Sequence, residues 1–120
     1  MNKFLIPLIF SFSMPLYAGK ANVVDVKVRC PSSCTFNVTV EHADTGWEHY
    51  ADQWDVLTPD GKNVLATRVL YHPHVNEQPF TRSLGNVKIA KDIDHVIVRA
   101  KDSKHGWGGV EQKVELPPRP

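Results

Sequence analysis

The chain has 120 residues, and its 14 basic and 13 acidic side chains leave a formal net charge of +1. This balance argues against nucleic-acid binding, because the sequence has no basic stripe that could neutralise phosphates. A chain of this length supports one modest hydrophobic core, so we expect a single folded domain.

The first segment, residues 1–18, has the pattern of a secretory signal peptide. MNKFLIPLIFSFSMPLYA carries one basic residue, Lys3, then a short apolar run and small residues near its end. We expect cleavage after Ala18, or as late as Ala21. The apolar run is too short to span a bilayer, which takes about 20 apolar residues. The sequence therefore predicts a protein that is periplasmic or secreted and has no membrane contact after cleavage.

A β-domain is predicted over residues 22–116, followed by a short tail at 117–120. In NVVDVKVR, Val24, Val26 and Val28 alternate with charged residues. This period of two predicts a half-buried strand with the three valines on its buried face.

A second strand is predicted over TFNVTVE, where Phe36, Val38 and Val40 share one face. The two strands form a predicted hairpin, because only the CPSSC segment separates them. Cys30 and Cys34 could bind copper as thiolates. An exported chain is oxidised by default, so a disulfide is favoured, with a stabilising effect of about 2 kcal/mol for so short a loop.

The remaining strands follow at short intervals. They are predicted over QWDVLT, NVLATRVL, FTRSLGNVKI (as one strand or two), DHVIVRAK and VEQKVEL, with a Pro-Asp-Gly turn after the first. No stretch keeps a helical period for about a dozen residues. The predicted fold class is all-β, a single antiparallel immunoglobulin-like β-sandwich of about seven strands.

Histidines gather at the ends of these predicted strands. His42 ends the second strand, His49 lies in the loop after it, and His105 follows the DHVIVRAK strand. The ends of alternate strands meet at one end of a sandwich, so these rings can converge there. Imidazole suits zinc, copper and iron, and the cluster therefore predicts a transition-metal site.

The HPH triplet is a second candidate for metal binding. On an extended segment, His72 and His74 face the same side and could bind one ion together. The alternative, favoured for this triplet taken alone, is an exposed turn without a ligand.

The loop around His49 also allows two interpretations. Glu41, Asp44 and Glu48 could accept hydrogen bonds that fix the tautomers of the histidine rings. Alternatively, Asp44 caps a turn with Thr45, and Trp47 plugs the end of the sandwich.

Arg82 lies on a predicted strand face between Phe80 and Leu84. This position suits an edge strand whose arginine pairs with a carboxylate such as Glu77. The alternative is an arginine that binds an anion.

Two segments resemble superoxide reductases of the neelaredoxin and desulfoferrodoxin type. EHADTGWEHYADQWDVLTPDG is similar to the segment of that family that reads roughly H-P-x-x-x-E-H, and DSKHGWGGVEQKVEL is similar to its C-x-x-H-G-x-W segment. Members are immunoglobulin-like sandwiches whose single iron is held by four histidines and one axial cysteine. The chain also resembles exported proteobacterial proteins.

The resemblance implies ligand roles for His42, His49 and His105. Asp102 stands where the family has its axial cysteine, so it becomes a candidate ligand. No histidine precedes Glu41 to match the family's first ligand, and His72 or His74 could take that place. Losing the thiolate removes the ligand that tunes the iron, so the resemblance implies the fold more than the activity.

Three functions are therefore expected, in this order. The first is an exported, non-catalytic metal-binding protein with zinc, copper or iron. The second is a metal-free module that binds a periplasmic protein through Trp47, Trp54 and Trp107. The third is an iron redox protein of superoxide-reductase type without its axial cysteine. Nucleophilic catalysis has no support, because no G-x-S-x-G motif is present.

Overall fold

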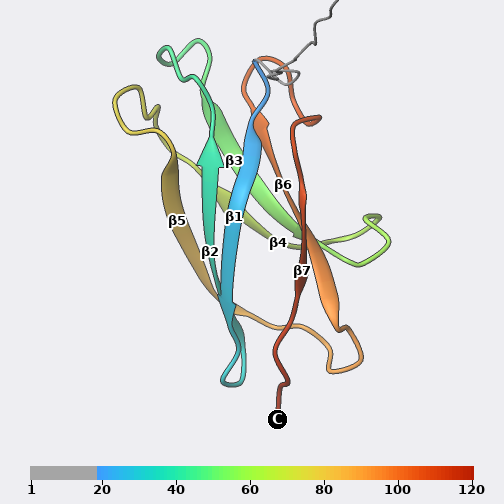
Figure 1. Ribbon diagram of the computed structural model, residues 1–120. Coiled ribbons are helices and arrows are strands. Elements are labelled where there is room, and N and C mark those ends of the chain that lie inside the picture. Colours follow the sequence, from blue (N-terminus) through green and yellow to red (C-terminus); the bar gives the residue numbers. More distant parts are fainter. Residues whose placement is uncertain (1–18) are drawn as a thin grey trace, which may run out of the picture.

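The computed structural model describes residues 19–120, so the predicted signal peptide lies outside the described residues. Seven strands form two antiparallel sheets that face each other, with strand orders β1-β2-β5 and β4-β3-β6-β7 (Figure 1). This is the immunoglobulin-like sandwich that the sequence predicts. Within the described part, no helix is long and apolar enough to cross a bilayer. The strands are β1 (Asn22–Arg29), β2 (Cys34–Glu41), β3 (Ala51–Leu57), β4 (Val64–Val69), β5 (Phe80–Val87), β6 (His95–Asp102) and β7 (Gln112–Glu115).

The first hairpin is formed by β1 and β2 and is closed by a disulfide. Cys30 and Cys34 are bonded, and their Cα atoms are 4.0 Å apart. Val28 lies opposite Phe36 in the register of the two strands. The predicted disulfide is confirmed, and both sulfurs are used in it, so copper binding by free thiolates does not apply to this state.

The predicted inward face of β1 is wrong at Val24. The register shifts between Val23 and Asp25, which marks a β-bulge. Val23 is fully buried, whereas Val24 is 42% exposed. A bulge inserts one extra residue and so reverses the alternation beyond it, a change that period-two patterning cannot reveal.

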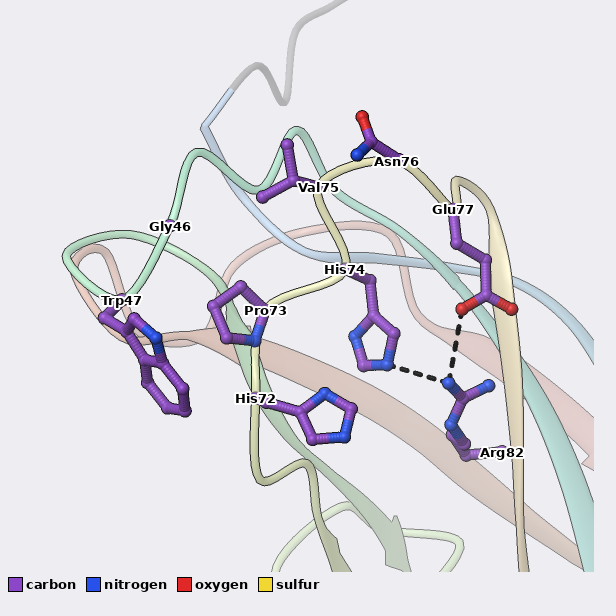
Figure 2. Close-up of a pocket in the computed structure, with 9 residues that line it drawn as sticks. All are labelled: Gly46, Trp47, His72, Pro73, His74, Val75, Asn76, Glu77 and Arg82. Carbon is purple, nitrogen blue, oxygen red and sulfur yellow. Dashed lines mark hydrogen bonds and ion pairs between the residues drawn. The ribbon is translucent and has the colours of Figure 1, made fainter.

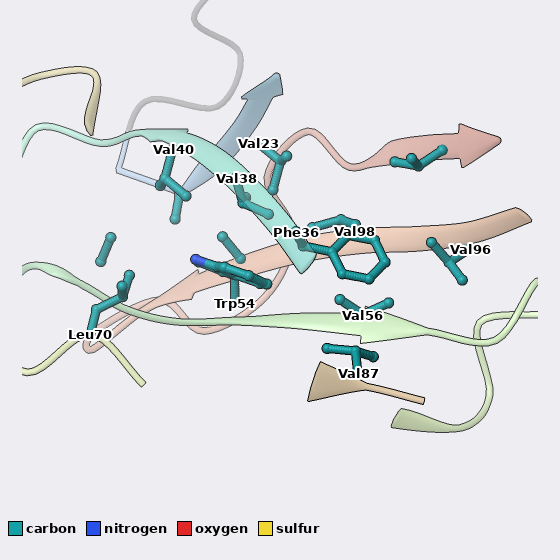
Figure 3. Packing of buried hydrophobic residues seen from close by; sticks show 14 of the residues in the cluster. Val23, Phe36, Val38, Val40, Trp54, Val56, Leu70, Val87, Val96 and Val98 are labelled. Carbon is teal, nitrogen blue, oxygen red and sulfur yellow. The ribbon is translucent and has the colours of Figure 1, made fainter. Parts of the chain in front are cut away.

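The hydrophobic core fills the space between the sheets (Figure 3). Phe36, Val38 and Val40 of β2 are fully buried, as predicted, and Trp54 of β3 is buried with them. Trp54 therefore cannot belong to a recognition surface, and that part of the interaction hypothesis is wrong. Trp47 is 67% exposed, so it does not plug the end of the sandwich.

The register of β3 and β6 sets up the end of the sandwich that carries the histidines. Ala51, the first residue of β3, lies opposite Asp102, the last residue of β6. The loop that follows β2 lies at this same end, and the β1–β2 turn with its disulfide lies at the other (Figure 1).

Candidate metal centre

Three histidine rings meet at one carboxylate oxygen. Oδ2 of Asp102 lies 2.9 Å from Nε2 of His42, 2.9 Å from Nε2 of His49 and 3.1 Å from Nδ1 of His105. The donor atoms of His42, His49 and Asp102 all lie within 4.8 Å of one another. These four residues, predicted together from the sequence, are thus together in the structure.

The backbone positions each of them. His42 comes directly after the last residue of β2, and Asp102 ends β6. His49 lies in a tight turn, where its N–H donates to the carbonyl of Gly46 at 3.1 Å. Gly46 has φ +143°, a conformation that side-chain-bearing residues rarely adopt, so glycine suits this turn.

The second oxygen of Asp102 belongs to the backbone. Oδ1 accepts hydrogen bonds from the N–H groups of residues 104–106, with lengths of 3.1 Å from Lys104 and 3.2 Å from Gly106. This carboxylate therefore organises the turn after β6 with one oxygen and gathers the histidines with the other.

The electrostatics of Asp102 favour its charged form. Burial alone would raise the pKa of this carboxyl group. The backbone N–H of His105 and the side-chain hydrogen bonds from His49, His105 and His42 outweigh burial, and they hold the pKa well below its usual value. A fully buried carboxylate is thus kept as an anion at the centre of the histidine cluster.

His42 lies between two carboxylates. Its Nδ1 is 2.6 Å from Oδ1 of Asp44, and its Nε2 is 2.9 Å from Oδ2 of Asp102. A neutral imidazole has only one N–H. With both carboxylates ionised, one contact then sets a nitrogen lone pair against a carboxylate oxygen, unless a proton or a metal cation lies between them.

Asp44 is held rigidly behind His42. It accepts the backbone N–H of Ala51 at 3.1 Å and that of His74 at 2.6 Å. The predicted role of Asp44 as an acceptor for a histidine ring is therefore confirmed. Glu48 instead contacts the hydroxyl of Thr45, at 3.4 Å.

The cluster is buried on one side and open on the other. The side chain of His42 is fully buried, that of His49 is 18% exposed and that of His105 is 41% exposed. Solvent therefore reaches the centre from the side of His49 and His105.

The HPH triplet does not join this group. The rings of His72 and His74 have centroids 5.0 Å apart, and the His74 ring stacks on Phe80 at 4.0 Å. Nε2 of His74 lies 2.8 Å from Nη2 of Arg82. Arginine only donates, so this nitrogen accepts and Nδ1 carries the proton, which leaves no free lone pair on the ring for a metal.

The environment of His74 agrees with a neutral ring. Burial lowers the pKa of His74, and the nearby charge of Arg82 lowers it further. Arg82 also pairs with Glu77 at 3.3 Å from an edge strand, as predicted. Its bond to His74 was not predicted, because a spacing of eight residues across a loop gives no periodic signal.

Comparison with known proteins gives one relative. A protein of Halomicrobium mukohataei described as a "Putative lipoprotein" is 39% identical to this chain over 98 residues, which is 80% of the chain. The chain spans 47% of the length of that relative. No family model matches the chain, and no solved structure matches it.

Proposed function

We propose that this chain is an exported metal-binding protein in which His42, His49, His105 and Asp102 hold one transition-metal ion. The observation that carries the proposal is the position of His42 between two carboxylates. With Nδ1 donating to Asp44, the lone pair of Nε2 points at Oδ2 of Asp102. A cation placed between them turns this repulsion into two coordination bonds.

The separations of the donor atoms support an ion at this point. Ligands about 2.1 Å from a metal lie about 3.0 Å apart when they are at right angles, and about 3.4 Å apart in a tetrahedron. The three nitrogens lie 2.9, 2.9 and 3.1 Å from Oδ2 of Asp102. Small side-chain movements would thus suffice to close the site around an ion.

The donor set favours zinc or copper. Three imidazole nitrogens and one carboxylate oxygen suit either ion, and Asp44 would orient His42 and raise its basicity from behind. Iron is suggested by the resemblance to superoxide reductases alone. An oxygen of Asp102 in place of a cysteine sulfur removes the thiolate that tunes such an iron, so we assign the centre a non-catalytic role.

Export has two supports. The first 18 residues have the composition of a signal peptide, and the relative from Halomicrobium mukohataei is described as a lipoprotein. The disulfide fits the same compartment, since disulfides persist in oxidising environments.

The test is elemental analysis of the mature protein, purified without chelators, followed by metal titration of variants. We expect about one equivalent of a single transition metal, and affinity losses of more than about tenfold in His49→Ala and His105→Ala. These partly exposed ligands are better targets than buried His42. His95→Ala is the control, because His95 pairs with Asp94 at the start of β6.

Two results would contradict the proposal. One is a protein that binds neither zinc, copper nor ferrous iron at micromolar concentrations. The other is an equal affinity in all three variants, which would locate the bound metal elsewhere.

A further inference from the structure

A cleft of about 650 Å³ opens beside the metal centre (Figure 2). One wall is formed by Gly46 and Trp47 from the β2–β3 loop, and the other by residues 72–77 from the β4–β5 loop, with Arg82 of β5 beyond them. The volume is that of a small-molecule site. None of the proposed metal ligands lines the cleft, so the two sites have separate residues.

Apolar groups are exposed on this cleft. Trp47 is 67% exposed and Val75 is 51% exposed, and Pro73 lies between Trp47 and His74 in the view of Figure 2. Large exposed aromatic side chains in a concave site favour contact with the apolar body of a ligand.

Arg82 supplies a charged end. One of its nitrogens, Nη2, contacts both Nε2 of His74 at 2.8 Å and Oε1 of Glu77 at 3.3 Å (Figure 2). The bond to His74 fixes the guanidinium group at the cleft. Glu77 is 59% exposed in its side chain, and such exposed ion pairs contribute little. A carboxylate already lies against Arg82, and one from a ligand with better geometry can replace it.

His74 adds an unpaired donor. The residue is 94% buried, since its exposed fraction is 6%, and within the described chain its Nδ1 has no hydrogen-bond partner. Figure 2 shows this side of the ring facing Pro73 and His72. His72 is exposed, so its ring can turn and admit an acceptor atom to the Nδ1–H group. Buried donors are nearly always paired, so an acceptor there is favoured.

We infer that this cleft binds a small organic carboxylate, which pairs with Arg82 in place of Glu77 and lays its apolar body against Trp47 and Pro73. The inference goes beyond metal binding and does not depend on it. The two sites touch only through Asp44, which accepts from the His42 ring and from the backbone N–H of His74.

The experiment is a titration with benzoate, followed by NMR of the side-chain N–H groups and by calorimetry. It uses the mature protein stripped of metal, and then the same protein loaded with zinc. We expect saturable binding in both forms, with shifts at Trp47 and Arg82. Benzamide, which lacks the charge, and acetate, which lacks the apolar body, should each bind about tenfold more weakly.

Variants give changes of opposite sign. Arg82→Gln should weaken benzoate binding about tenfold, because the charged partner is lost. Glu77→Gln should tighten it about threefold, because the competing carboxylate is gone. Trp47→Ala, at an exposed position, should weaken it without unfolding the protein. Arg29→Gln removes the same charge as Arg82→Gln from an exposed position on β1 and should change nothing.

A role of Arg82 in stability alone would not make Glu77→Gln bind more tightly. The inference is overturned if benzoate does not bind, if Glu77→Gln leaves the affinity unchanged or weaker, or if Trp47→Ala binds like the wild type. Equal affinity for benzamide overturns the assignment to a carboxylate.

Discussion

His42 and Asp102 meet at 2.9 Å across 60 residues of sequence, and both side chains are fully buried. His42 follows a strand of the β1-β2-β5 sheet, and Asp102 ends a strand of the other sheet. Their contact therefore joins the two layers at the end that carries the metal centre.

Asp102→Asn should lower the free energy of unfolding of the metal-free protein by about 3 kcal/mol, because removing one partner of a buried charged network leaves the others uncompensated. Urea denaturation would measure the change. Asp52→Asn is the matched control. Its partly exposed pair with Lys101, at 2.9 Å, should contribute no more than about 1 kcal/mol. Similar losses in both variants would contradict a special role for Asp102.

His74 should make the stability depend on pH. Its pKa is lower in the folded protein than the ordinary value of 6.5, first through burial and then through Arg82. The unfolded chain therefore binds more protons just below pH 6.5, so this contribution to stability is present above 6.5 and is lost as the pH falls through the folded pKa. Urea unfolding between pH 8 and pH 5 should give a flatter profile for His74→Gln than for the wild type. Parallel profiles would exclude this role.

The disulfide should contribute about 2 kcal/mol, because it closes a loop with a sequence separation of only 4. The double substitution Cys30→Ala, Cys34→Ala should lower the free energy of unfolding by that amount in chemical denaturation. Metal affinity should stay the same, since the disulfide lies at the opposite end of the sandwich. A large loss of affinity would show that the two ends are coupled.

Two tryptophans should differ sharply in their effect on stability. Trp54→Ala removes a fully buried side chain and should cost about 3–5 kcal/mol. Trp47→Ala, at a position that is 67% exposed, should change the stability by no more than about 0.5 kcal/mol. Thermal and urea unfolding of both variants would test this contrast, and a marked loss with Trp47→Ala would restore its role as a plug.

Alternation of side chains carried most of the fold prediction. It gave the buried face of β2 correctly, because Phe36, Val38 and Val40 lie in a regular stretch that pairs with strands on both sides. It failed at Val24, where a bulge changes the register of an edge strand. Patterning works where the ladder is regular and fails where one residue is inserted.

The candidate site was predicted through the ends of strands. His42 and Asp102 could be placed because each lies at the boundary of a strand that the pattern defined. The path of the β4–β5 loop could not be predicted, since loops have no period. The separation of His74 from the metal centre, and its bond to Arg82, therefore required the structure.

The long sequence separations within the metal centre have a consequence for the order of folding. Asp102 contacts His42 and His49 across 60 and 53 residues, whereas the disulfide spans 4. Contacts across such distances form only after the intervening chain has been organised, because loop closure costs entropy. A newly made chain thus presents four scattered side chains that cannot act as one chelator. An ion bound there would mark those molecules in which both layers have assembled, and would keep them assembled.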